Sequence, residues 1–274
     1  QRQMCIRDRP NDTSDGGAYG GITFEHKPDA LSLWVKRSHG TEKTTEKASV
    51  IFYSWKGQTT SRVKTGLSNA PVEIDMIDRE KDVLGMIQDG VTKSDDFELI
   101  SKSENYIEGD ISEWTQFTYP IDYVSDGTPE KINIILSSSD YFDRSQLGKD
   151  NKFWVDDVRF VYYSRLKSLK LNGVEIEGFS PDVYEYTVEG DFITNGVNLE
   201  EYELMSPFTS ANTDIHVDQN GNPEYAEIIV GRYDEDGGLL GGEYKDVDGQ
   251  TSHTYRINSV SYTHLRAHET AANL

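Results

Sequence analysis

The sequence predicts an all-β protein built from two β-sandwich domains. Apolar and polar residues alternate in short runs that are separated by clusters of Gly, Asn, Asp and Ser, whereas segments with a helical period are scarce. The 274 residues are too many for one small sandwich and enough for two. All four tryptophans precede residue 164, which indicates two cores of different composition.

The first domain contains most of the clear strand signals. A segment of helical period, Arg79–Gln88, is interrupted by Gly85 and fits a short helix and a strand equally well. Turn residues separate the period-two runs. We expect strands at residues 22–25, 30–36, 49–55, 72–77, 114–123, 131–137 and 153–163.

A change of charge supports a domain boundary after Tyr163. Residues 11–163 contain 27 acidic and 17 basic residues, whereas residues 164–258 contain 19 acidic and 6 basic residues. The second segment has strand-like runs around Leu166–Leu171, Tyr184–Val188, "YAEIIVGRYD" and "TSHTYRI". Its length and its short strands predict a smaller Ig-like sandwich at residues 164–258.

The two ends resemble translated sequencing-adaptor read-through. The strings are "QRQMCIRDR" at the start and "SVSYTHLRAHETAANL" at the end, so we assign residues 1–10 and 259–274 to artefactual tails. The single cysteine, Cys5, and the spaced pair His264 and His268 then carry no chemistry. We expect the native chain to start near Asn11, with any signal peptide or lipid anchor lost upstream.

The overall charge limits the partners. A formal net charge of -21 repels phosphate backbones and anionic lipid surfaces, which excludes nucleic acid as a partner. No run of apolar residues is long enough for a transmembrane segment. Neutral glycans, cations and basic proteins remain as possible partners.

Three motifs resemble the "putative carbohydrate metabolism domain" of Bacteroidetes outer-surface proteins. An opening strand carries Gly21, Phe24, Pro28 and Leu31. A later strand, "WTQFTYPIDY", carries Trp114, Phe117, Pro120 and Tyr123. The segment that leads to the closing strand carries Ser137, Ser138, Ser139, Gly148, Val155, Asp156 and Asp157, although "KDNKF" replaces the usual Gly-Ser of that family.

The resemblance covers about residues 17–163 and implies a galactose-binding-like jelly roll. It also implies carbohydrate capture at the outer-membrane surface of a Gram-negative, gut-type bacterium, and it brings no established catalytic residues. The motifs "LKSLKLNG" and "FSPDVYEYTV" make the second domain similar to the cadherin-like or Ig-like modules that accompany such domains.

Asp156 and Asp157 are the candidate metal ligands. Asp156 shares its strand parity with Trp154, Val158 and Phe160, so we expect it to face an apolar layer, where a bare carboxylate is costly. The resemblance implies a structural Ca²⁺ at such an Asp, and calcium requires six to eight oxygen ligands. The N-terminal loop offers further oxygens from Asn11, Asp12 and Asp15. The alternative is that the two aspartates accept loop amide hydrogen bonds or pair with an arginine.

Aromatic residues supply the candidate glycan site. Trp34 lies between Ser32 and Lys36 on the polar face of its strand, where an indole needs a partner, and a sugar ring can stack on it. The alternative is packing against a loop or the other domain. Tyr53 and Trp55 share one face of the next strand and are weaker candidates, with a core role favoured for Trp55. Trp114 is expected in the core.

Three functions stay open at this point. The favoured one is a non-catalytic glycan-binding surface protein whose partner is a neutral poly- or oligosaccharide. The second is a glycoside hydrolase, which needs two carboxylates at a defined separation that the linear sequence does not identify. The third is an adhesion or assembly module that binds another surface protein.

Overall fold

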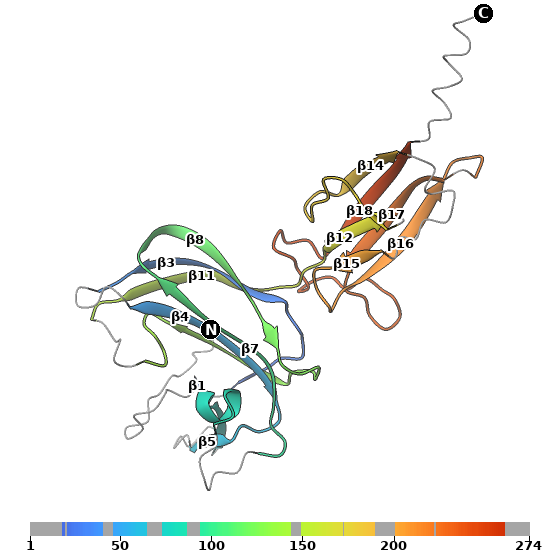
Figure 1. Cartoon of the computed structure of the whole chain (residues 1–274). Helices are drawn as coiled ribbons and strands as arrows, with labels where there is room; N and C mark the ends of the chain where they lie inside the picture. The colour runs from blue at the N-terminus through green and yellow to red at the C-terminus, as the bar shows by residue number, and fades with distance from the viewer. Residues whose placement is uncertain are drawn as a thin grey trace, which may run out of the picture. The chain divides into compact units, whose positions relative to one another are not determined.

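The computed structural model of the chain describes residues 18–19, 21–40, 46–64, 73–86, 94–143, 149–171, 173–189, 201–221 and 223–260. Two compact units divide between Phe160 and Val161 (Figure 1). Cys5, His264 and His268 lie outside the described residues. The final strand continues to Val260, so Ser259 and Val260, which we had assigned to the tail, belong to a strand.

Unit 1 is a sandwich of a five-stranded and a three-stranded sheet. The five-stranded sheet has the order β2-β10-β4-β7-β9, with antiparallel pairs throughout, and the three-stranded sheet has the order β11-β3-β8. The strands are β2 (Ile22–Thr23), β3 (Ala30–Ser38), β4 (Lys47–Lys56), β7 (Glu98–Glu108), β8 (Ile111–Pro120), β9 (Asp122–Tyr123), β10 (Lys131–Ser137) and β11 (Lys152–Val161). The prediction of an all-β sandwich is confirmed.

The core of unit 1 lies between these two sheets. Leu31, Leu33 and Val35 of β3 pack against Ala48 and Val50 of β4. Because side chains alternate along a strand, the other residues of β3 face away from the core. The inward parity of β3 therefore fixes which side chains the three-stranded sheet presents on its outer face.

The second face of the five-stranded sheet is also covered. A small sheet of β1 (Ala18–Tyr19), β6 (Glu73–Ile77) and β5 (Ser61–Lys64) and the short π-helix η1 (Arg79–Val83) lie on this side, as Figure 1 shows. Ile51, Tyr53 and Trp55 of β4 pack there with Ile77. The sequence left a helix and a strand open for the segment that begins at Arg79, and the structure shows a short helix there.

The sequence failed to predict β7, the partner of the central strand β4. Its sequence, "ELISKSENYIE", is largely polar and lacks a strong apolar alternation. Ser101 and Ser103 are nevertheless buried, and the Ser101 and Ser54 hydroxyls lie 2.6 Å apart in a hydrogen bond. Small hydroxyl side chains that bond one another in the core explain why hydrophobic periodicity misses this strand.

Unit 2 is a smaller sandwich of a three-stranded and a four-stranded sheet. Its sheets have the orders β13-β12-β15 and β14-β18-β17-β16. Leu166, Leu169, Ile228, Tyr255 and Ile257 are at the centre of its core. The strands are β12 (Leu166–Leu171), β13 (Val174–Glu175), β14 (Glu185–Glu189), β15 (Tyr202–Leu204), β16 (Ser210–Val217), β17 (Pro223–Gly231) and β18 (Ser252–Val260).

The pairing within unit 2 is mixed. Strand β14 runs parallel to β18, whereas β17 is antiparallel to both β18 and β16. Tyr186 is buried, and Tyr184 and Val188 pack against the same core, as the alternation of β14 predicts. The Ig-like or cadherin-like assignment of this sandwich stays a prediction. In the described part of the chain, no helix is both long and apolar enough to cross a membrane.

Candidate functional site

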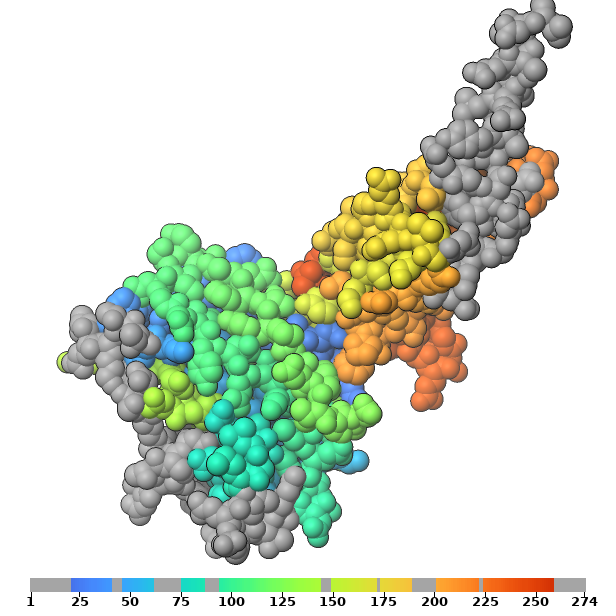
Figure 2. Space-filling model, viewed as in Figure 1, coloured from blue at the N-terminus to red at the C-terminus, as the bar shows by residue number. Residues whose placement is uncertain are grey.

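The outer face of the β11-β3-β8 sheet gathers the exposed tryptophans of unit 1. Trp34 on β3, Trp114 on β8 and Trp154 on β11 have exposed fractions of 36%, 43% and 47%. Each follows from the same alternation, because Leu33, Phe117 and Val155 contact the core from the inward positions of the three strands. Residues of β8, in green, lie at the surface of unit 1 in Figure 2.

We name this surface the indole face and define it by its outward side chains. Its polar members come from all three strands. The indole face consists of Ser32, Trp34, Lys36, Trp114, Gln116, Thr118, Lys152, Trp154 and Asp156.

Hydrogen bonds hold the polar groups beside Trp34. Trp34 lies directly opposite Gln116 in the β3–β8 register, and Ser32 lies opposite Thr118. Gln116 Nε2 donates to Ser32 Oγ at 3.0 Å, and Thr118 Oγ1 donates to the same oxygen at 3.3 Å. Ser32 itself is buried, so these contacts hold the exposed Gln116 amide and Thr118 hydroxyl next to an exposed ring, a mixture of groups that recognises a polar ligand with one apolar face.

A lysine covers one side of Trp114. Lys36 Nζ lies 5.6 Å from the centroid of the Trp114 ring and 4.0 Å from Glu113 Oε2. A cation over an aromatic ring and near a carboxylate has its charge largely compensated. Because Lys152 and Asp156 also carry opposite charges, the indole face is close to neutral, although the whole chain has a net charge of -21.

The structure corrects the assignment of Tyr53 and Trp114 and bears out the core role favoured for Trp55. Trp55 and Tyr53 have exposed fractions of 0% and 1%, so neither offers a ring face to a ligand. Trp114, expected in the core, is exposed instead. The signal that would have found Trp114 and Trp154 is strand parity, since each shares its face with polar neighbours.

Tyr53 is part of a partly buried ion-pair network rather than of a ligand site. Its hydroxyl donates to Glu104 Oε1 at 2.5 Å, and Arg79 donates to both oxygens of Glu104 at 2.8–3.0 Å. Burial and the hydrogen bond to Glu104 raise the pKa of Tyr53. Burial also opposes ionisation of Glu104, but the bonds from Arg79 and Tyr53 outweigh it and hold the pKa of Glu104 below its usual range.

Asp156 does not face an apolar layer, contrary to the parity argument. Asp157 has a φ of +46°, and this irregularity interrupts the alternation of β11. The core is contacted by odd-numbered residues before Asp157, Phe153 and Val155, but by the even-numbered Phe160 after it. Both aspartates are exposed.

Local contacts account for the two aspartates. Asp156 Oδ1 accepts from the Asp157 backbone N–H at 2.9 Å, and Asp157 Oδ2 lies 3.8 Å from Arg159 Nε. Asp12 and Asp15 lie outside the described residues. Within the described ranges no three His, Cys, Asp or Glu side chains are grouped as a metal site would need. The calcium site therefore stays a prediction.

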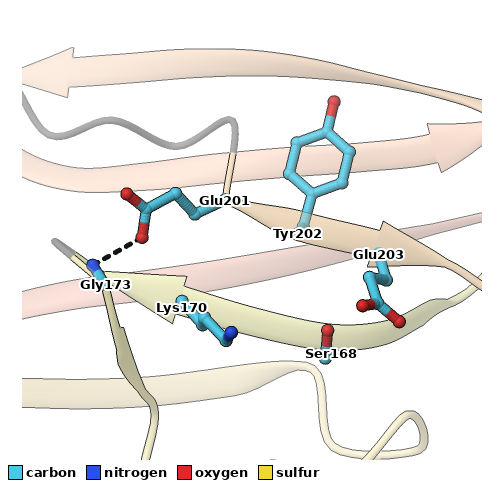
Figure 3. Close-up of a pocket in the computed structure, with 6 residues that line it drawn as sticks. All are labelled: Ser168, Lys170, Gly173, Glu201, Tyr202 and Glu203. Atoms are coloured by element: carbon cyan, nitrogen blue, oxygen red, sulfur yellow. Dashed lines mark hydrogen bonds between the residues drawn. The ribbon is translucent and has the colours of Figure 1, made fainter.

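A pocket of about 380 Å³ lies on unit 2 (Figure 3). Ser168, Lys170, Gly173, Glu201, Tyr202 and Glu203 line it. Glu201 accepts from the Gly173 backbone N–H, and Glu203 pairs with Lys167 at 3.2 Å. Figure 3 shows the two carboxylates pointing in different directions, whereas a glycoside hydrolase needs a pair that faces a common bond.

A serine, a histidine and an aspartate are also connected within unit 2. His253 Nδ1 lies 2.9 Å from Ser164 Oγ, and His253 Nε2 lies 2.8 Å from Asp248 Oδ2. Both His253 and Ser164 are buried, although a solitary histidine in a sequence is more often a surface residue. Because a substrate has no access to a hydroxyl in this position, the group is structural, and it joins Ser164 at the start of unit 2 to the turn before β18.

Two solved structures are similar to this one at a low level. One is described as a "putative glycoside hydrolase" from Bacteroides vulgatus ATCC 8482, with 18% identity, a TM-score of 0.33, and coverage of 51% of this chain and 54% of that chain. The other has the same description and is from Bacteroides thetaiotaomicron VPI-5482, with 18% identity, a TM-score of 0.33, and coverage of 54% and 41%. A likeness of this size carries no functional argument. No family model and no curated protein matches the chain.

Proposed function

We propose that the protein is a non-catalytic glycan-binding module that holds neutral carbohydrate on the indole face. The observation that carries the proposal is the exposure of Trp34, Trp114 and Trp154 on one sheet face that also carries polar side chains. The flat C–H surface of a sugar ring stacks on an indole, and hydroxyl, amide and ammonium groups between the rings bond its hydroxyls.

The composition of the indole face favours a sugar over a protein partner. Protein-binding patches combine aromatic residues with a contiguous apolar centre. Here Gln116 lies opposite Trp34 and next to Trp114 on the same face of β8, and Gln116, Thr118 and Ser32 form a hydrogen-bonded group. An exposed open face also differs from the cleft with two facing carboxylates that hydrolysis requires.

The location outside the cell is part of the same proposal. The resemblance of residues 17–163 implies a protein of the outer-membrane surface of a Gram-negative bacterium, where a glycan-binding module captures carbohydrate. The Ig-like sandwich would then act as a spacer. The predicted Ca²⁺ near Asp156 and Asp157 would be structural.

A binding screen with matched variants tests the function. The wild-type chain, Trp34→Ala and Tyr106→Ala are assayed by affinity electrophoresis against a panel of neutral polysaccharides. Tyr106 has the same exposed fraction as Trp34, 36%, but lies on β7 of the other sheet. Loss of a central aromatic contact costs about 2 kcal/mol, or about 30-fold in affinity.

The expected result is retardation of the wild type and of Tyr106→Ala by at least one polysaccharide, with retardation weakened in Trp34→Ala. If all three proteins migrate alike on every polysaccharide, with folding verified by circular dichroism, the proposal is wrong. Release of reducing sugar by the wild type would instead support the hydrolase alternative.

A further inference from the structure

The three exposed indoles are distributed one to a strand. Trp154 lies on β11, Trp34 on β3 and Trp114 on β8, and β3 is the middle strand of the three. Neighbouring strands lie about 4.8 Å apart, so a line from β11 to β8 crosses about 10 Å of sheet. A single sugar ring does not reach from the first indole to the third, whereas a chain of several sugars does.

The β3–β8 register places Trp34 and Trp114 on a diagonal. Trp34 is opposite Gln116, and Trp114 is two residues away from Gln116 along β8. Diagonal neighbours of this kind lie about 7–8 Å apart, close enough for adjacent sugars of one chain to contact both rings. Gln116 therefore lies between two stacking positions, where its amide is placed to bond a hydroxyl near the linkage.

The row of indoles extends from one edge strand of the sheet to the other. Strands β11 and β8 are the two edge strands of the three-stranded sheet, so a chain that passes over all three indoles leaves the sheet over both edges. A site of this kind binds the interior of a long chain. A site for a terminal sugar would instead need a wall at one end of the row.

The charges of the face favour an uncharged chain. Lys36 lies 4.0 Å from Glu113 and over the Trp114 ring, and the face carries Asp156 as well as Lys152, so it offers little net positive charge to a uronate or sulfate group. The formal net charge of -21 disfavours a polyanion further.

From this arrangement we infer that the indole face binds an internal segment of a linear, uncharged polysaccharide that runs across β11, β3 and β8, with one sugar-stacking position at each indole. The inference rests on the proposed function. It adds that the ligand is a linear, uncharged polysaccharide and that its chain runs across the strands. Trp34 is the shared central position, and Trp114 and Trp154 are the two outer positions.

A length series separates this inference from the proposed function. The probes are purified oligosaccharides, from the monosaccharide to the octasaccharide, of the polysaccharide that retards the wild type most strongly. Calorimetric titration is carried out on the full chain and on Trp34→Ala, Trp114→Ala, Trp154→Ala and the control Tyr106→Ala. Urea denaturation of each variant verifies that it is folded.

The expected result is an affinity that rises with chain length and becomes constant once three positions are filled. Trp114→Ala and Trp154→Ala lose roughly tenfold on the longest oligosaccharide and reach their plateau at a shorter length, because each removes one of several linked contacts. Trp34→Ala weakens binding at every length. Tyr106→Ala matches the wild type.

Two results would overturn the inference while leaving the proposed function intact. One is equal affinity for the monosaccharide and the octasaccharide, which indicates a single sugar position. The other is a loss in only one indole variant, with the others unchanged at all lengths. Absence of binding to every polysaccharide would overturn both, and stronger binding to a polyuronate than to any neutral chain would refute the uncharged class.

Discussion

Replacing Trp55 by alanine should destabilise unit 1 far more than replacing Trp34. Trp55 is completely buried on the covered face of β4, and its ring contacts Gly21 so closely that a Cβ there would lie 2.9 Å from it. Burial of 150–250 Å² at about 25 cal/mol per Å² gives about 4–6 kcal/mol for the indole. Measured large-to-small core substitutions of this kind cost about 3–5 kcal/mol.

Trp34→Ala removes an indole that is more than one-third exposed and leaves no closed cavity. We expect it to cost about 1 kcal/mol, in the range of surface substitutions that lose some packing. The difference between the two variants should therefore be at least about 2 kcal/mol in the free energy of unfolding of unit 1.

Urea denaturation followed by tryptophan fluorescence measures this difference in the intact chain. All four tryptophans belong to unit 1, so their emission reports the unfolding of that unit alone. Each variant keeps three of the four reporters. Equal destabilisation by Trp34→Ala and Trp55→Ala would refute the assignment of one indole to the surface and the other to the core.

Three further predictions concern stability. Glu104→Gln should make the stability of unit 1 less dependent on acid pH. The folded-state pKa of Glu104 is lowered, so its ionised form stabilises the fold above the unfolded-state pKa, and this stabilisation is lost as pH falls through the folded-state pKa. Urea midpoints that fall equally in both proteins between pH 7 and pH 3 would contradict this. Gly57→Ala should cost unit 1 more than about 2 kcal/mol, because the φ of Gly57 is +74° and a Cβ would meet the Asp96 carbonyl oxygen at 1.8 Å. Gly85→Ala should cost only about 1 kcal/mol, because Gly85 has a similar φ of +67° but open space around its Cβ position. Equal urea midpoints for the two variants would be evidence against the close contact at Gly57. Asp246→Ala should cost unit 2 about 2–3 kcal/mol, because buried Arg165 loses one of its three carboxylate partners and the buried Ser164 backbone N–H loses its acceptor. Thermal melts by circular dichroism should show this loss while tryptophan emission stays unchanged, and an unaltered melt would exclude a structural role for Asp246.

Strand parity predicted part of the candidate site correctly. The alternation of Leu31, Leu33 and Val35 places Trp34 on the opposite face, and the structure shows it there. The same reasoning assigns Asp156 to the wrong environment, because Asp157 adopts a positive φ and the alternation changes within β11. A linear sequence carries no clear mark of such an irregularity, since aspartate occupies many ordinary strand positions.

Burial of polar strands was the other limit of prediction from sequence. Strand β7 pairs with the central strand along its whole length, yet its buried positions include Ser101 and Ser103. Their hydroxyls are satisfied by Ser54 Oγ and by the Pro120 carbonyl, contacts that form only after the sheet has assembled. The burial of His253 could not be predicted for the same reason. Its partner Ser164 is 89 residues away in the sequence, and its partner Asp248 lies in an ordinary turn sequence.

Oxidative footprinting of the indoles tests glycan recognition by the β11-β3-β8 sheet most directly. The chain is treated with an indole oxidant, with and without the best-binding neutral polysaccharide, and each tryptophan is quantified by mass spectrometry. Trp34, Trp114 and Trp154 should be oxidised in the free protein and protected by the polysaccharide, while buried Trp55 stays unreactive in both samples. Unchanged oxidation of all three exposed indoles at a saturating ligand concentration would contradict the account.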